Sequence, residues 1–391
     1  MPRKRKRMTR TTEELPGHQR RASPDGLTRY VLVLAAGIGT TVILYCAKDL
    51  FILAFISGIF AFLLHPLVHK LESLHFPTWA AATVSCLLTA AVVLCAFFFL
   101  GWQYAHFGED LPELKTLLIE KIDHAQRYFE SRTHISQSAQ TAWMKQEVAG
   151  LADSAGAVMV TLFSTTGAAL ATIILIPIFT FFLLLLKGKF RIFFERLSTR
   201  DGVVLKVVQS ISVLSRKWLK GVLTVMLVLS VLNSVGFLLL GLKYAVLLGV
   251  TAAVLNVIPY IGPWIGALMP ITIALLTKDS AMYAVGAAGV ILITQFIDNN
   301  FVTPKVMGSS VSINPLASIV ALLAGGMLWG VVGLILAIPI TGMLKLVFDE
   351  IPEMQPWGFL LGEEKTFPES QRIQMPFARR KPRTAEGGPI S

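Results

Sequence analysis

The sequence predicts an all-α, polytopic integral membrane protein with about eight transmembrane helices, one of them broken by Pro and Gly. Of the 391 residues, 54% are hydrophobic and only 15% are charged, which excludes an ordinary soluble domain. Apolar runs of membrane-spanning length recur along the chain, and the charged segments between them differ in sign. The central apolar run, residues 245–277, carries prolines and glycines that a continuous helix avoids.

The N-terminal segment, residues 1–29, holds nine Lys or Arg against three acidic residues, so we expect a cytoplasmic tail that can bind anionic lipid. A basic head followed by the apolar run 30–46 resembles a signal peptide. A second apolar run, 50–64, follows almost at once without a convincing cleavage site. The sequence therefore predicts an uncleaved helical hairpin and then a third span over 79–100, within a membrane region of residues 30–101.

Residues 102–155 reverse the charge balance, with five basic and eight acidic side chains, which is typical of an external segment. Leu111, Leu114, Leu118 and Ile122 recur at helical spacing and predict an amphipathic external helix. This apolar stripe would fit either the membrane interface or a neighbouring copy of the chain in a homo-oligomer. The sequence does not choose between these two partners.

A fourth span is predicted within residues 156–186, with a bend at Pro177. Residues 187–220 then hold nine basic against two acidic side chains, so we expect amphipathic helices on the cytoplasmic surface. A fifth span follows over 221–241 and opens the C-terminal transmembrane core, residues 221–348.

Two prolines predict the break in the central run. Pro259 and Pro263 lack a backbone N–H and push the preceding residue out of the α region, so the helix over 245–277 should break between Ile258 and Gly262. Unpaired backbone groups are tolerated at membrane depth only where protein or a water-filled cavity satisfies them. Interrupted helices of this kind often mark substrate sites in secondary transporters. The alternative is a Pro-kinked helix that serves packing only.

The remaining chain holds a span over 281–297, a polar loop, and an apolar run over 313–348 that is too long for one straight crossing. Glycines and Pro339 within that run predict a kink or a short re-entrant turn. If this run and 245–277 each make one net crossing, there are about eight spans and both termini, including the tail over 349–391, are cytoplasmic.

Enzyme chemistry is disfavoured because the sequence contains no HExxH, no GxSxG and no GxxxxGK[ST] motif. We therefore predict a protein that is not an enzyme and uses no cofactor. His65 and His69 would share one helical face as metal ligands, but Pro66 lies between them and no third ligand accompanies them, so no metal site is predicted. The positive charge lies beside apolar segments, which favours membrane orientation over nucleic-acid binding.

Polar side chains crowd one membrane boundary and flank the predicted break. Gln295, Asp298 and Asn299 form a candidate site for a coupled proton or cation, although Asp298 would also suit a helix cap in water. Asn256 and Tyr260 lie beside the exposed backbone of the break, where their side chains donate and accept hydrogen bonds. This second pair therefore suits an uncharged polar substrate.

Three stretches of the C-terminal half carry a family resemblance. They are LLGLKYAVLLGVTAAVLNVIPYIGPWIG, QFIDNNFVTPKVMGSSVSINPL and GGMLWGVVGLILAIPITGMLKLV. In these motifs the chain resembles the AI-2E, or autoinducer-2 exporter, family of permeases, and the order and spacing of the earlier spans agree. The resemblance implies a polytopic fold with a large external segment after the third span. It also implies export of small molecules or antiport of ions.

The resemblance places the family's signature residues at the break, in the polar loop and in the last apolar run. They fall on Asn256, Pro259, Tyr260, Gly262 and Pro263, then on Asp298, Asn299, Pro304, Lys305 and Gly308, and then on Asn314, Pro315, Gly330, Gly333 and Pro339. The chain departs from the family at Thr78, where Arg is frequent, and at Val222, where Gln is frequent. These departures weaken any transfer of substrate.

Three functional hypotheses follow for a multi-pass protein of the bacterial inner membrane. The first is a secondary transporter that exports a small polar molecule of the autoinducer-2 kind. The second is a Na⁺(Li⁺)/H⁺ antiporter that uses Asp298. The third is a membrane scaffold that assembles partners and transports nothing. The expected partners are thus a small-molecule or ion substrate and membrane lipid.

Overall fold

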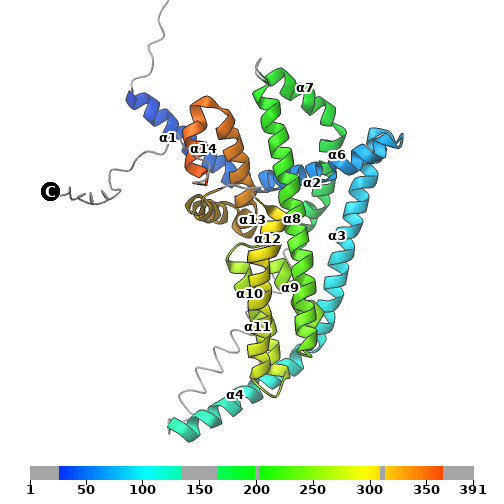
Figure 1. Cartoon of the computed structure of the whole chain (residues 1–391), viewed down its shortest axis with the longest axis vertical. Coiled ribbons are helices and arrows are strands. Elements are labelled where there is room, and N and C mark those ends of the chain that lie inside the picture. Colours follow the sequence, from blue (N-terminus) through cyan, green and yellow to red (C-terminus); the bar gives the residue numbers. More distant parts are fainter. Residues whose placement is uncertain (1–25, 134–165, 199–201, 309–312, 364–391) are drawn as a thin grey trace, which may run out of the picture. The chain divides into compact units, whose positions relative to one another are not determined.

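The computed structural model describes residues 26–133, 166–198, 202–308 and 313–363, and nearly all of these residues are helical (Figure 1). The chain divides into two units, residues 1–48 and residues 49–391. Helix α1 (Gly26–Cys46) belongs to the first unit. The described part of the chain thus confirms the predicted all-α fold class.

The other helices belong to the second unit or, for α2, begin at the boundary. In chain order they are α2 (Lys48–Ser73), α3 (Thr78–Glu109), α4 (Leu111–Thr133), α6 (Thr166–Leu185), α7 (Lys187–Leu197), α8 (Val203–Leu239), α9 (Ala245–Leu255), α10 (Ile261–Thr277), α11 (Met282–Ile297), the π-helical segment η1 (Asp298–Val302), α12 (Thr303–Met307), α13 (Pro315–Glu350), η2 (Pro352–Met354) and α14 (Gln355–Leu361).

Helix α8 is the element against which α9, α11, α12 and α13 all pack. Its backbone approaches that of α9 closely, because a Cβ atom at Gly249 would overlap Ser234. Phe237, Leu247 and Leu248 are fully buried in the apolar cluster at this contact. The close approach therefore places α9 against the second half of α8 in this state.

Helices α9 and α10 form a hairpin. A Cβ atom at Gly266 would lie 3.1 Å from the Cα atom of Ala252, whereas fourteen residues of continuous helix would separate these positions by about 21 Å. At the turn, a Cβ atom at Gly262 would overlap the carbonyl oxygen of Leu255. The predicted break is thus a complete reversal of the chain, held by glycines that let the two helices touch.

Helix α13 is a second hairpin. Gly330 has non-helical dihedral angles of φ 62° and ψ −140°. A Cβ atom at Gly325 would lie 2.6 Å from the carbonyl oxygen of Gly333, although eight residues of straight helix span about 12 Å. The predicted kink or re-entrant turn is therefore a reversal at Gly330.

The two hairpins correct the assumption of one net crossing each for residues 245–277 and 313–348. A hairpin returns the chain to the end of the bundle at which it began. Helix α9 has 11 residues and a length of about 16 Å, which is well short of the ~30 Å hydrocarbon core. Both runs are therefore apolar hairpins rather than single straight helices.

The hairpins begin at opposite ends of α8. Lys243, just beyond the end of α8, pairs with Asp110 at a distance of 2.7 Å, and the Lys121 ammonium donates to the carbonyl of Lys278 at 3.0 Å. Both ends of the α9–α10 hairpin therefore lie against α3 and α4. The end of α13 lies at the other end of α8, where Glu350 pairs with Lys206 at 2.7 Å.

Five described helical segments are long and apolar enough to cross a membrane: Lys48–Ser73, Thr78–Glu109, Val203–Leu239, Met282–Met307 and Pro315–Glu350. The last of these is the α13 hairpin. Shorter apolar helices lie at Leu34–Cys46, Ile174–Leu185, Ala245–Leu255 and Ile261–Thr277.

Several boundaries differ from the predictions. Helix α3 continues to Glu109, beyond the predicted end of the third span. The described part of the fourth span is α6, which contains Pro177, and the bend there stays a prediction. The predicted external segment beyond residue 133 and the first part of the fourth span, up to residue 165, lie outside the described residues. Those parts of the predicted organisation stay predictions.

The predicted amphipathic helix is α4, and part of its apolar stripe contacts the chain itself. Leu114 is buried in the cluster that α9 and α10 contribute to, and Leu118 packs against that cluster. Leu111 is exposed, and the side chain of Ile122 lies outside the described part. The centre of the stripe is therefore covered by the α9–α10 hairpin.

Candidate functional site

Backbone groups at the tip of the α9–α10 hairpin form hydrogen bonds with one another. Ile258 N–H donates to the carbonyl of Leu255 at 2.9 Å, and Gly262 N–H donates to the carbonyl of Ile258 at 3.0 Å. Tyr260, between them, has a φ of 63°, which is rare for a bulky residue. The reversal thus satisfies part of the backbone that the broken helix frees.

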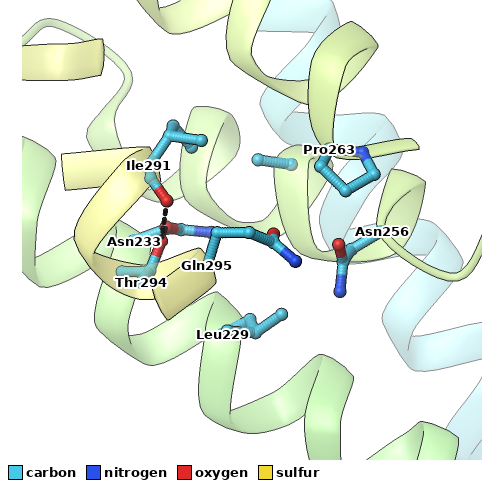
Figure 2. Close-up of a pocket in the computed structure, with 8 residues that line it drawn as sticks. Leu229, Asn233, Asn256, Pro263, Ile291, Thr294 and Gln295 are labelled. Atoms are coloured by element: carbon cyan, nitrogen blue, oxygen red, sulfur yellow. Dashed lines mark hydrogen bonds between the residues drawn. The ribbon is translucent and has the colours of Figure 1, made fainter. Parts of the chain in front are cut away.

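A small cavity lies between this tip, α8 and α11 (Figure 2). Its volume is about 10 Å³, which is room for about one water molecule. Four polar side chains and four apolar residues line it: Asn233, Asn256, Thr294 and Gln295, with Leu229, Ala252, Pro263 and Ile291. The lining is thus half polar and half apolar, and it carries no formal charge.

One buried polar pair holds α8 against α11 beside the cavity. The Thr294 hydroxyl donates to the side-chain oxygen of Asn233 at 2.7 Å, and Asn233 is only 4% exposed. The Thr294 hydroxyl also lies 3.0 Å from the carbonyl of Ile291 (Figure 2). A buried polar side chain costs stability unless it is hydrogen-bonded, so this pair fixes the orientation of the Asn233 amide toward α11.

Asp298 lies one helical turn beyond the cavity and is 4% exposed. Its carboxylate accepts hydrogen bonds from the Asn256 amide at 3.3 Å and from the Thr303 hydroxyl at 2.7 Å. Among the described residues no Lys, Arg or His forms an ion pair with it. The alternative in which Asp298 caps a helix in water does not fit this burial.

The predicted substrate residues are not all in one place. Asn256 and Pro263 line the cavity, whereas Pro259, Tyr260 and Gly262 do not. Tyr260 is 67% exposed and Gly262 is buried against α9. The structure therefore brings one predicted polar group to the cavity and gives Gly262 a packing contact.

The predicted ion-coupling residues are divided in the same way. Gln295 lines the cavity and donates to the side-chain oxygen of Asn299 at 3.4 Å. Asn299 is exposed, and Asp298 contacts the hairpin tip through Asn256. Within the described residues, no group of three or more His, Cys, Asp or Glu residues has a geometry that could hold a metal ion.

The predicted motif residues after Asp298 occupy helix ends and turns. Pro304 and Lys305 lie on α12 and are exposed, and Gly308 ends that helix with a φ of 54°. Gly330 and Gly333 lie at the α13 reversal. Asn314 and Pro315 start α13, and Pro339 is buried within its second half.

Asn314 ties the start of α13 to the end of α14, so we predict a stability loss when its side chain is removed. Its side-chain oxygen accepts from Ala317 N–H at 2.8 Å, and its amide donates to the carbonyls of Leu360 and Gly362 at 2.6 and 3.3 Å. Asn314→Ala should cost about 1–3 kcal/mol, because it removes a helix cap and two further bonds. Melting of the detergent-purified protein measures this loss.

Asn314→Ser is the matched control, since serine retains the cap but not the amide donors. Its melting temperature should fall between those of the parent and Asn314→Ala. Equal melting temperatures for all three proteins would contradict the assigned role.

Sequence reasoning missed Asn233, Thr294 and Thr303. Asn233 had a usable signal, because an amide in the middle of an apolar span must find a partner at membrane depth. Thr294 had a weaker one, since threonine hydroxyls commonly bond within their own helix. Thr303 had none, because it lies five residues from Asp298 and the two share a face only in a π-helix.

Comparison with known proteins supports the same family as the sequence motifs. The sequence profile of the AI-2E family of transporters matches residues 32–353, which is most of the chain. The chain belongs to the AI-2E transporter family. It is a membrane-embedded, multi-pass protein of that family, and its apolar helices agree with this.

Relatives of this chain are named as transport proteins or permeases. Putative transport protein YrrI of Bacillus subtilis is 40% identical over 35% of this chain, but the match spans only 38% of YrrI. Putative permease PerM of Escherichia coli K12 is 26% identical over 86% of this chain and 97% of PerM. AI-2 transport protein TqsA of the same organism is 24% identical over 83% of this chain and 94% of TqsA.

Proposed function

We propose that this AI-2E family member is a secondary transporter that exports a small polar molecule across the bacterial inner membrane. The observation that carries the proposal is the set of four uncharged polar side chains in the cavity at the hairpin tip. Asn233, Asn256, Thr294 and Gln295 present amide and hydroxyl groups there from three different elements. Such groups bind hydroxyl- and carbonyl-rich solutes by donating and accepting hydrogen bonds. The name of TqsA supports an autoinducer-2-like substrate.

The arrangement of the hairpins supports alternating access to this cavity. The α9–α10 hairpin approaches α8 from one end and its tip reaches Asn233. The α13 hairpin begins at the other end of α8, and Trp329, beside its turn, packs in a cluster with Val222. In secondary transporters, interrupted helices of this kind form the solute site, and the parts around it move to open it to either side. The ~10 Å³ cavity corresponds to the closed state of such a path.

Solute flux into vesicles containing only the purified protein tests the proposal. Inside-out vesicles that contain the protein should take up more autoinducer-2 than protein-free vesicles do. The Asn233→Leu variant should lose this uptake even when it assembles normally. The substitution removes an amide that donates and accepts hydrogen bonds in the cavity. Absence of flux for every small polar solute tried, including Na⁺, would instead support a non-transporting scaffold.

Cation/proton antiport is the second candidate, and the burial of Asp298 favours it. Ionisable residues at membrane depth often mark proton or cation pathways, and Asp298 is 4% exposed without a basic partner among the described residues. In this candidate Asp298 exchanges a proton for Na⁺ or Li⁺. Vesicles that acidify or alkalinise on addition of these cations would support it.

The orientation that we propose places both termini and α7 in the cytoplasm and α4 outside. The basic balance of residues 187–220 and the acidic balance of residues 102–155 support it. In a variant without native cysteines, Thr116→Cys on α4 should react with an impermeant thiol reagent in intact cells. Lys189→Cys on α7 should react only after the membrane is opened. The reverse pattern would refute this orientation.

A further inference from the structure

The junction of α3 and α4 contacts both ends of the α9–α10 hairpin. We define this elbow as residues 107–121, with Asp110 at the turn between the two helices. Figure 1 shows α4 turning away from α3 at this point. Elbow side chains reach both the residues that enter α9 and those that leave α10.

At the entry to the hairpin, Asp110 engages two consecutive residues. Its carboxylate lies 2.7 Å from the Lys243 ammonium and accepts a hydrogen bond from the Tyr244 hydroxyl. The ring of Phe107 meets the Tyr244 ring edge-on, with centroids 5.3 Å apart. Lys243 lies 5.1 Å from the centre of the same Tyr244 ring. These contacts converge on one residue at the start of α9.

Tyr244 has a φ of 64°, in the left-handed region. A bulky residue is strained there and persists only when its surroundings determine its conformation. The contacts with Asp110 and Phe107 hold Tyr244 in this conformation. The entry to the hairpin is therefore held in a strained backbone state by the elbow.

At the exit, Lys121 donates to the carbonyl of Lys278 at 3.0 Å, just beyond the last residue of α10. A cation at this position satisfies a free carbonyl and complements the helix dipole. Leu114, between the two polar contacts, is buried in the cluster with Leu247 and Leu276. The elbow thus contacts the hairpin at both ends and along its side.

We propose that Asp110 is a positioning residue that latches the α9–α10 hairpin in the closed state seen here. The inference rests on the proposed function, since it treats the hairpin as the moving gate of a transporter. Movement of the hairpin away from α3 must break the Asp110 contacts with Lys243 and Tyr244. When the Asp110 contacts are lost, the cavity opens whether or not substrate is present, while the fold stays intact.

Cysteine accessibility tests the latch without a transport assay. In a variant lacking Cys46, Cys86 and Cys95, Leu229→Cys places a thiol in the cavity wall. A small water-soluble thiosulfonate should label this thiol slowly in the parent and at least about tenfold faster with Asp110→Ala, because a partly exposed ion pair and its hydrogen bond hold the closed state. The charge-reversed pair Asp110→Lys with Lys243→Asp should return the rate toward that of the parent.

Glu113→Ala is the matched control, because Glu113 is an exposed acid on the first turn of α4 and should leave labelling unchanged. Melting temperature separates a latch from general damage: a structural role alone would lower the melting temperature of Asp110→Ala without selective labelling of residue 229. A parent-like labelling rate in Asp110→Ala, or an equal rise in Glu113→Ala, would overturn the proposal. If the parent moves no solute but the labelling pattern holds, the proposed function fails and the latch stands.

Discussion

Gly262→Ala should open the tip of the α9–α10 hairpin and abolish transport. The new Cβ atom would overlap the carbonyl oxygen of Leu255, a backbone atom that cannot rotate away. Overpacking at a rigid contact costs about 1–3 kcal/mol or more, which lowers the population of the closed tip by about 5–150-fold. Because Asn256 lies in the same turn, it would move away from Asp298 and from the cavity.

The measurement is solute or cation flux per correctly assembled protein, together with protection of the amides of residues 255–258 and 260–262 from hydrogen exchange. Gly289→Ala is the matched control, since a Cβ atom there would meet nothing within 4 Å. Flux and protection should both fall in Gly262→Ala and stay at parent values in Gly289→Ala. Undiminished flux in Gly262→Ala would remove the hairpin tip from the mechanism.

Asp298→Asn should abolish proton-coupled cation exchange while leaving the hairpin tip in place. Asparagine keeps the shape of the side chain, and its amide oxygen can still accept the hydrogen bond from Thr303. It can no longer bind and release a proton. If Asp298 couples ions, cation-dependent pH changes in vesicles should therefore fall to the level of protein-free vesicles.

The same variant separates the two candidate functions. Downhill flux of an uncharged solute through the Asn256 cavity does not require the charge and should persist in Asp298→Asn. Asp279→Asn is the control, because Asp279 is the other carboxylate between residues 221 and 348 and is exposed. Cation exchange that survives Asp298→Asn unchanged would exclude Asp298 as the coupling group.

Local chemistry made part of the fold predictable. Apolar runs of sufficient length predicted the membrane helices, and Pro259 and Pro263 predicted a break that the structure places at residues 256–260. The reversal of the chain at that break was not predictable, because it depends on Gly266 meeting Ala252 across two different helices. For the same reason, replacing only the two prolines with Ala should not straighten the segment, since the glycine contacts that hold α9 against α10 would remain.

The candidate site was partly predictable for a related reason. Asn256, Gln295 and Asp298 stood out because polar groups at membrane depth are costly, and all three lie in or beside the cavity region. Asn233 has the same property but lies in the fifth span, outside the motifs. Its partnership with Thr294 depends on how α8 packs against α11, which no local pattern specifies.

The π-helical segment Asp298–Val302 acts as a one-residue insertion in the helix that runs from α11 into α12. If the same five residues took up regular α-helical winding with no change of length, everything after them would rotate by about 100°, because a π-helical turn holds one residue more than an α-helical turn. Thr303 would then turn away from Asp298, and Met307 would leave its contact with Gly221 on α8. The π-helical form is therefore what keeps α12 against α8, whereas deletion of one residue from this stretch would give a regular helix that leaves the parts on either side in nearly the same orientation.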